Sequence, residues 1–169
     1  MTDLKHHIVE TRDFPEPGIL FRDFSPLLRD HFPATLDALD ALLTPAEWAG
    51  IDYVAGVDAR GFVLGAALAA RHRLGFVPIR KGGKLPPPVQ QLSYKLEYGE
   101  ATLEMHSGQG RLLLVDDVFA TGGTLKAAAD LCALSGYVPQ AILVLADLRL
   151  QGMVAAVNGM AVRSVFHYG

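Results

Sequence analysis

The chain has 169 residues, of which half are hydrophobic and a fifth are charged. At about 150 residues per domain, this length predicts a single domain over residues 1–169, and the composition excludes an intrinsically disordered chain. The formal net charge is −3, with 15 basic and 18 acidic residues. No overall positive field is therefore available to attract a nucleic acid or an anionic membrane, and any anion must be bound by a local site.

The cysteine content and the N-terminal residues predict the cellular location. Cys132 is the single cysteine, which excludes an intramolecular disulfide and a cysteine-built zinc site and is typical of a reducing compartment. The first residues do not resemble a signal peptide, and no run approaches the roughly 20 apolar residues of a membrane span. We expect a cytoplasmic protein whose partners include neither a nucleic acid nor a membrane.

The first third of the chain is rich in proline and in large apolar side chains. Four prolines fall between residues 15 and 33, which predicts an irregular apolar segment rather than a linker. Residues 34–43 then place leucines at helical spacing. This spacing predicts a helix that ends at Thr44 and Pro45.

From residue 51, short apolar runs alternate with longer runs rich in alanine and leucine. The alternation predicts an α/β fold in which helices cover both faces of a parallel sheet. Ligands bind at the carboxyl ends of the strands in such sheets, so the loops there are the candidate sites. The expected strands cover residues 51–57, 76–80, 111–117 and 141–146, the expected helices cover 61–72 and 124–135, and 161–168 is expected to contain a terminal strand.

Residues 81–108 interrupt the alternation. They contain a glycine pair and three consecutive prolines, and they show no clear helical pattern. A connection of this length is uncommon unless it has a function. We expect a binding loop or a small β-flap over the site.

The strongest chemical signal is the segment Val115–Thr124, VDDVFATGGT. It predicts a buried strand that ends in Asp116 and Asp117, followed by a glycine-rich turn that opens a helix. The turn and the helix N-terminus favour a phosphate, whereas carboxylates suit ribose hydroxyls or hydrated Mg²⁺. A plain turn with a threonine N-cap is the alternative, but it leaves two consecutive acids unexplained. The motifs of P-loop NTPases, dinucleotide enzymes, zincins and serine hydrolases are missing from the sequence.

The Val115–Thr124 segment resembles the phosphoribosyl-pyrophosphate (PRPP) motif of the type I phosphoribosyltransferases. Further segments at 13–23, 56–62, 75–86 and 96–104 are similar, in the same order, to those of the adenine-using members of this family. The resemblance implies the type I phosphoribosyltransferase fold, a mostly parallel central sheet flanked by helices. It also implies a flexible flap over residues 81–110 and a small N-terminal hood, residues 1–33, that recognises the base.

The activity that the resemblance implies is a step of purine salvage. The 5-phosphoribosyl group of PRPP would pass to adenine through an oxocarbenium-like transition state, giving AMP and pyrophosphate. Mg²⁺ is expected to enter with PRPP and to lie near Asp116 and Asp117, without a direct site of its own on the protein. Members of the family are generally homodimers, so a homodimer is expected here.

The roles of individual residues follow from the match, position by position. Glu97, Asp116, Asp117 and Arg60 are expected to be catalytic, with Glu97 moving a proton at the base and the two aspartates holding the ribose hydroxyls. The expected 5′-phosphate site is Ala120, Thr121, Gly122, Gly123 and Thr124. The expected pyrophosphate site is Asp58, Ala59, Arg60, Arg80, Lys81 and Lys84, and the peptide bond between Asp58 and Ala59 is expected to be cis or strained. The expected base site is Leu20, Phe21, Arg22, Val118 and Tyr98.

Two alternatives to adenine transfer stay open from the sequence. The first is the same reaction on a 6-oxopurine (hypoxanthine, guanine or xanthine). Enzymes for those bases usually carry an Asp at the position of Ala120 and a Lys at that of Gly123, so both residues here favour adenine. The second is a non-catalytic PRPP-sensing regulator, which would be expected to have lost pyrophosphate and flap residues such as Lys84 and Glu97.

Overall fold

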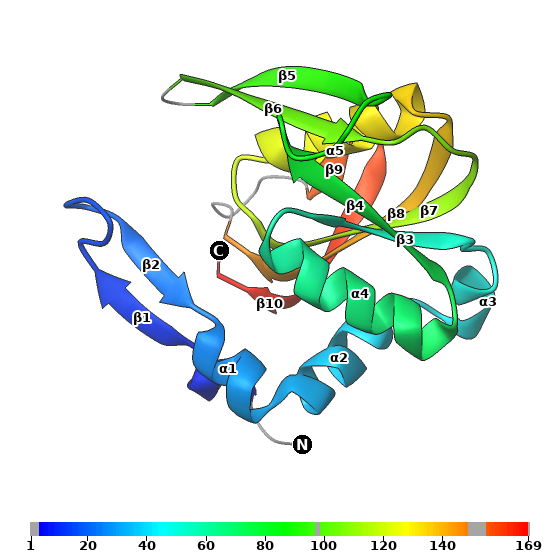
Figure 1. Cartoon of the computed structure of the whole chain (residues 1–169). Coiled ribbons are helices and arrows are strands. Elements are labelled where there is room, and N and C mark those ends of the chain that lie inside the picture. The colour runs from blue at the N-terminus through cyan, green and yellow to red at the C-terminus, as the bar shows by residue number, and fades with distance from the viewer. Residues whose placement is uncertain (1–3, 97–98, 149–154, 169) are drawn as a thin grey trace. The chain divides into compact units, whose positions relative to one another are not determined.

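The computed structural model describes residues 4–96, 99–148 and 155–168. The chain divides into two compact units, Met1–Ala41 and Leu42–Gly169, and each is described by itself (Figure 1). None of the helices in these described ranges is both long enough and apolar enough to cross a membrane.

The first unit contains a β-hairpin and three short helical segments. After the 3-10 turn η1 (Leu4–His7), strands β1 (Val9–Arg12) and β2 (Leu20–Asp23) pair antiparallel, and α1 (Ser25–Asp30) and α2 (Phe32–Asp40) follow. The Asp13 carboxylate accepts the Gly18 N–H at 2.7 Å and closes the hairpin loop. Pro26 and Pro33 lie in the first turns of α1 and α2, where a missing N–H costs nothing. The prediction of an irregular segment was therefore wrong, because these two prolines begin helices.

The second unit is built on one eight-stranded sheet with the order β5-β6-β4-β3-β7-β8-β10-β9. Its five central strands, β4, β3, β7, β8 and β10, are parallel, and the outer strands β5, β6 and β9 are antiparallel to their neighbours. The mostly parallel sheet and the β-flap, formed by β5 and β6, are thereby confirmed. The strands are β3 (Tyr53–Val57), β4 (Gly75–Lys81), β5 (Gln90–Leu96), β6 (Gly99–Met105), β7 (Gly110–Phe119), β8 (Tyr137–Asp147), β9 (Ala156–Val157) and β10 (Met160–His167).

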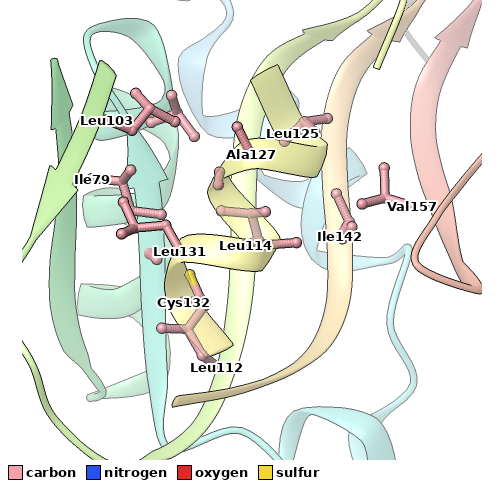
Figure 2. Close-up of a cluster of buried hydrophobic side chains, with 14 of the residues drawn as sticks. Ile79, Leu103, Leu112, Leu114, Leu125, Ala127, Leu131, Cys132, Ile142 and Val157 are labelled. Carbon is pink, nitrogen blue, oxygen red and sulfur yellow. The ribbon is translucent and has the colours of Figure 1, made fainter. Parts of the chain in front are cut away.

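Two long helices cover the sheet. Helix α4 (Arg60–His72) packs on β3 and β7, whereas α5 (Gly123–Leu134) packs on β8 and on the flap strands (Figure 1). Side chains alternate between the faces of a strand, so Leu112 and Leu114 of β7 lie together in the buried cluster that includes Leu131 and Cys132 of α5 (Figure 2). This cluster fixes α5, and hence the loop before it, against the carboxyl end of the sheet.

Several element boundaries differ from the prediction. The helix expected over 34–43 is α2, which ends at Asp40, four residues before Thr44. Thr44 does not end a helix. It is the N-cap of the next one, the short α3 (Pro45–Trp48), and forms a capping box with Glu47. Strand β8 starts at Tyr137, four residues before its predicted start, because its first residues continue the pairing with β7 across a register shift at Leu112 and Leu113. Strand β7 also continues two residues past its predicted end, to Phe119, so Asp116 and Asp117 lie just before the carboxyl end of the strand.

Candidate active site

A cavity of about 910 Å³ opens at the carboxyl ends of β3, β4 and β7 and beneath the flap. It combines acidic, basic and hydroxyl side chains with exposed backbone. Its lining residues are Val57, Asp58, Ala59, Arg60, Lys81, Gly82, Gly83, Gln91, Tyr94, Ala101, Thr102, Leu103, Asp116, Asp117 and Thr124.

The turn between β3 and α4 forms one wall of this cavity. The peptide bond between Asp58 and Ala59 is cis, as the family resemblance predicts. Helix α4 then begins so close to the sheet that a Cβ on Gly61 would lie 2.8 Å from the carbonyl oxygen of Val115. Glycine is required by this close approach, which carries Arg60 to the end of β7.

The acid pair near the carboxyl end of β7 is asymmetric. Asp116 and Asp117 are both buried. The Nε of Arg60 lies 2.7 Å from Oδ2 of Asp117, and the Asp117 N–H donates to Oδ1 of Asp116 at 2.9 Å. Burial, and next the negative charge of Asp117, raise the pKa of Asp116 well above its ordinary value. The site therefore holds one carboxylate paired with a cation beside a second that resists ionisation.

A second, smaller cavity of about 90 Å³ lies in the loop before α5, lined by Val118, Phe119, Ala120, Thr121, Gly122, Thr124 and Leu125. The N-cap of α5 is Gly122, at φ +83°, and no side chain caps the helix. The alternative of a threonine N-cap is therefore wrong. The first N–H groups of α5 lie at the smaller cavity, and no side chain at the N-cap accepts them. These donors make the cavity suited to an anion.

The three predicted cations at the end of β4 occupy different places. Lys81 lines the large cavity. Arg80 is turned toward Asp58, with Nε 3.6 Å from Oδ2, and its Nη1 donates to the Lys84 carbonyl oxygen at 3.4 Å. Lys84 itself is exposed on the following turn. The structure thus brings Lys81 together with Arg60 and the acid pair, whereas Arg80 supports the turns on either side.

The remaining predicted residues lie elsewhere. Glu97 and Tyr98 fall outside the described residues. Leu20, Phe21 and Arg22 form β2 in the first unit, and Val118 lines the smaller cavity of the second unit.

Sequence reasoning missed several flap residues of the cavity wall, including Gln91, Tyr94 and Thr102. The Tyr94 hydroxyl lies 3.4 Å from Oγ1 of Thr124, so the flap reaches the start of α5. This strand-to-helix contact depends on how β5 pairs with β6. The spacing of Tyr94 and Thr124 in the sequence does not indicate that the two residues are in contact.

Comparison with known proteins assigns the class of this fold and site. Residues 42–146 match the model of the phosphoribosyl transferase domain, and the chain belongs to this family.

Within the family, the chain is similar to adenine phosphoribosyltransferases. It is 47% identical to the one from Bdellovibrio bacteriovorus, over 98% of this chain and 99% of the relative. The solved enzyme from Rhodothermus marinus is 38% identical, with a TM-score of 0.79 and coverage of 97% and 96% of the two chains. The Saccharomyces cerevisiae enzyme, solved with an iminoaltritol bisphosphate and adenine, is 31% identical, with a TM-score of 0.84 over 96% of each chain.

Proposed function

We propose that the protein transfers the 5-phosphoribosyl group of PRPP to adenine, releasing AMP and pyrophosphate in purine salvage. The observation that carries the proposal is the convergence of three unlike features at one sheet edge. These are the buried acid pair, the start of α5, where no side chain caps the helix, and the cations Arg60 and Lys81. Near full-length relatives carry the name of this enzyme.

The three features correspond to the three parts of PRPP. The 5′-phosphate would bind the Ala120–Thr124 loop through backbone N–H groups and threonine hydroxyls. The ribose hydroxyls would bind Asp116 and Asp117, and the negative charge of this acid pair, held mainly on Asp117, would stabilise the positive charge that develops on the ring. The pyrophosphate would lie against the Asp58–Arg60 turn and Lys81, where cations stabilise the departing anion.

The chemical step exchanges one bond at C1′ for another. The C1′–O bond to pyrophosphate breaks, N9 of adenine bonds to C1′, and one proton leaves the base. Glu97 is the residue proposed to accept that proton. Arg60 can balance charge during the step, because its half-exposed guanidinium pairs with Asp117 and lines the cavity at the same time.

Mg²⁺ fits this site as a companion of PRPP. In the described part of the chain, no group of three or more His, Cys, Asp or Glu side chains is placed to hold a metal. Mg²⁺ commonly uses one or two carboxylates together with substrate phosphates, and Asp116 and Asp117 present carboxylate oxygens in the large cavity. When bound, Mg²⁺ would neutralise charge on the pyrophosphate.

Adenine would be selected by small residues in the phosphate loop and by the hood. Ala120 and Gly123 supply neither the acid nor the lysine expected of enzymes for 6-oxopurines. The base is proposed to bind Leu20, Phe21 and Arg22 of β2, with Val118 and Tyr98, largely through backbone groups and apolar contacts. Backbone recognition of this kind distinguishes an amino from an oxo group through the direction of the hydrogen bond.

The active form is proposed to be a cytoplasmic homodimer. The family resemblance supports the dimer, and the free thiol of the buried Cys132 is typical of a reducing compartment. Light scattering of the purified protein would report the mass of the assembly against the 18.2 kDa of one chain.

The test of the function is the release of pyrophosphate from PRPP in the presence of Mg²⁺, with adenine, hypoxanthine, guanine or xanthine supplied in turn. Release with adenine alone is expected. Release with a 6-oxopurine instead would overturn the base assignment, and tight PRPP binding without release with any base would indicate a sensor.

A further inference from the structure

Glu104 is a fully buried carboxylate that lies just outside the reacting groups. It belongs to β6, the inner strand of the flap, and its side chain points at the turn that follows β4. Its Oε2 accepts the Gly83 N–H at 2.9 Å and the Gln91 amide at 3.0 Å. Its Oε1 accepts the N–H groups of Lys84 and Leu85, at 2.5 and 2.6 Å. One carboxylate thus satisfies three successive backbone donors and one side-chain donor.

These bonds determine the shape of residues 81–85, the 81–85 turn. The Gly82 N–H donates to the Thr102 carbonyl at 2.9 Å, and Gly83 adopts φ +79°. On the opposite side, Arg80 donates to the Lys84 carbonyl. A turn whose consecutive N–H groups all point inward needs a buried acceptor, and Glu104 is that acceptor.

The 81–85 turn is also part of the cavity wall, since Lys81, Gly82 and Gly83 line the large cavity. The flap meets β4 over a short stretch, in which Arg80 pairs with Glu104 and Lys81 pairs with Leu103. Glu104 therefore lies at the junction of the flap, the 81–85 turn and the proposed pyrophosphate site.

The hydrogen bonds to the Glu104 carboxylate favour its ionised form. The hydrogen bond from Gly83, together with those from Gln91, Leu85 and Lys84, lowers the pKa of Glu104 to about 2 despite burial. The charge strengthens each of the four hydrogen bonds.

We propose that Glu104 is a positioning residue for the pyrophosphate group: it fixes the 81–85 turn and joins the flap to it, so that Lys81 and the backbone of Gly82 and Gly83 face the leaving group. Glu104 acts through the turn and does not touch substrate. This inference rests on the proposed function and adds to it a residue with no assigned role.

The test is the substitution Glu104→Gln in the full-length protein. Glutamine has the same shape, but it has an NH2 group in place of one carboxylate oxygen. The hydrogens of this group would face backbone N–H groups that the carboxylate oxygen accepted. The KM for PRPP and the inhibition constant of the product pyrophosphate should each rise about tenfold, as loss of a charged hydrogen bond does. The KM for adenine should stay within about twofold, because the base is proposed to bind other residues. Glu104→Asp, which retains the charge, should give intermediate values.

Asp52→Asn is the matched control. The Asp52 carboxylate also accepts a backbone N–H, that of Arg111, at 2.8 Å, and its bonds to Arg111 lower its pKa to about 2. It lies next to the amino end of β3, away from the large cavity. A merely structural role for Glu104 would make both variants less heat-stable without changing PRPP binding in either one.

The outcomes separate the inference from the function on which it rests. Unchanged PRPP and pyrophosphate constants in Glu104→Gln, or an equal rise in the adenine KM, would overturn the positioning role. Activity of the unaltered enzyme would show that the proposed function still holds. If Glu104→Gln does not fold, Glu104→Asp decides: a raised KM for PRPP supports the role, and an unaltered one overturns it. Absence of pyrophosphate release by the unaltered protein would overturn the proposed function and this inference with it.

Discussion

Replacing Asp116 by asparagine should stabilise the substrate-free protein while it lowers activity. Asp116 is buried beside a second carboxylate, and both features raise its pKa. At a pH above that raised pKa the protein carries a disfavoured buried charge, and each unit of elevation corresponds to about 1.4 kcal/mol. Asparagine has the same shape, has no charge, and can still accept the Asp117 N–H that Oδ1 of Asp116 accepts.

The sign of the pH dependence follows from proton binding. Between the ordinary pKa of 3.8 and the raised one, the folded protein binds more protons at Asp116 than the unfolded chain does. Stability therefore falls as pH rises through that window, by at most about 1.4 kcal/mol per pH unit. Asp116→Asn should therefore have a higher Tm than the unaltered protein above the window, by about 2–4 °C for each kcal/mol of charge burial that it removes. The gain should vanish below pH 3.8, where Asp116 is neutral in both states.

Asp117→Asn should change stability less than Asp116→Asn does, because the loss of an ion pair opposes the relief of the repulsion on Asp116. It removes the 2.7 Å ion pair with Arg60, whose side chain is 48% exposed, so the loss should be no more than about 1 kcal/mol. Both variants should release pyrophosphate at least about tenfold more slowly, since each removes a charge at the reacting ring.

Thermal unfolding from pH 3.5 to 9, combined with steady-state turnover, tests both statements. Destabilisation of Asp116→Asn at pH 8, or an advantage that does not shrink on acidification, would refute the electrostatic reasoning.

Three further predictions concern other parts of the molecule. Gly61→Ala would place a Cβ 2.8 Å from the Val115 carbonyl and should lower the free energy of unfolding in urea by about 1–3 kcal/mol; unchanged stability would show that α4 can shift. Burial raises the pKa of the Cys132 thiol to about 12, so a disulfide reagent should modify it only after unfolding, and rapid modification of the native protein would contradict its burial. Glu97→Gln should slow single-turnover chemistry more than it weakens PRPP binding, and an unchanged rate would remove Glu97 from the mechanism.

Local periodicity was sufficient for the elements that build the sheet edge. The helix predicted over 61–72 is Arg60–His72, and the strand predicted over 111–117 lies within Gly110–Phe119. These segments are buried, so their apolar pattern reflects their packing directly. The residues at their ends, Asp116 and Asp117 among them, could for that reason be assigned to one site from the amino-acid sequence alone.

The first unit and α3 were harder to predict because their signals are short. Prolines in an apolar segment suggest interruptions, but Pro26 and Pro33 lie in the first turn of a helix, where proline is favoured. The pair Thr44 and Glu47 is a capping box that sequence inspection could have found.

Glu104 shows what the sequence could not reveal. A glutamate in a predicted flap is usually solvated, and the place of Glu104 in a segment that resembles the family implies no role for it. Its burial depends on the antiparallel pairing of β6 with β4, which brings it to N–H groups 19 to 21 residues away in sequence. Contacts of that range are set by tertiary structure rather than by residue pattern.

The most direct test of the central claim measures AMP and pyrophosphate together, from adenine, PRPP and Mg²⁺, with the unaltered protein and with an Asp116→Asn, Asp117→Asn double variant. The account predicts equal amounts of the two products from the unaltered protein and little of either from the double variant. Pyrophosphate without AMP, or undiminished AMP from the double variant, would contradict it.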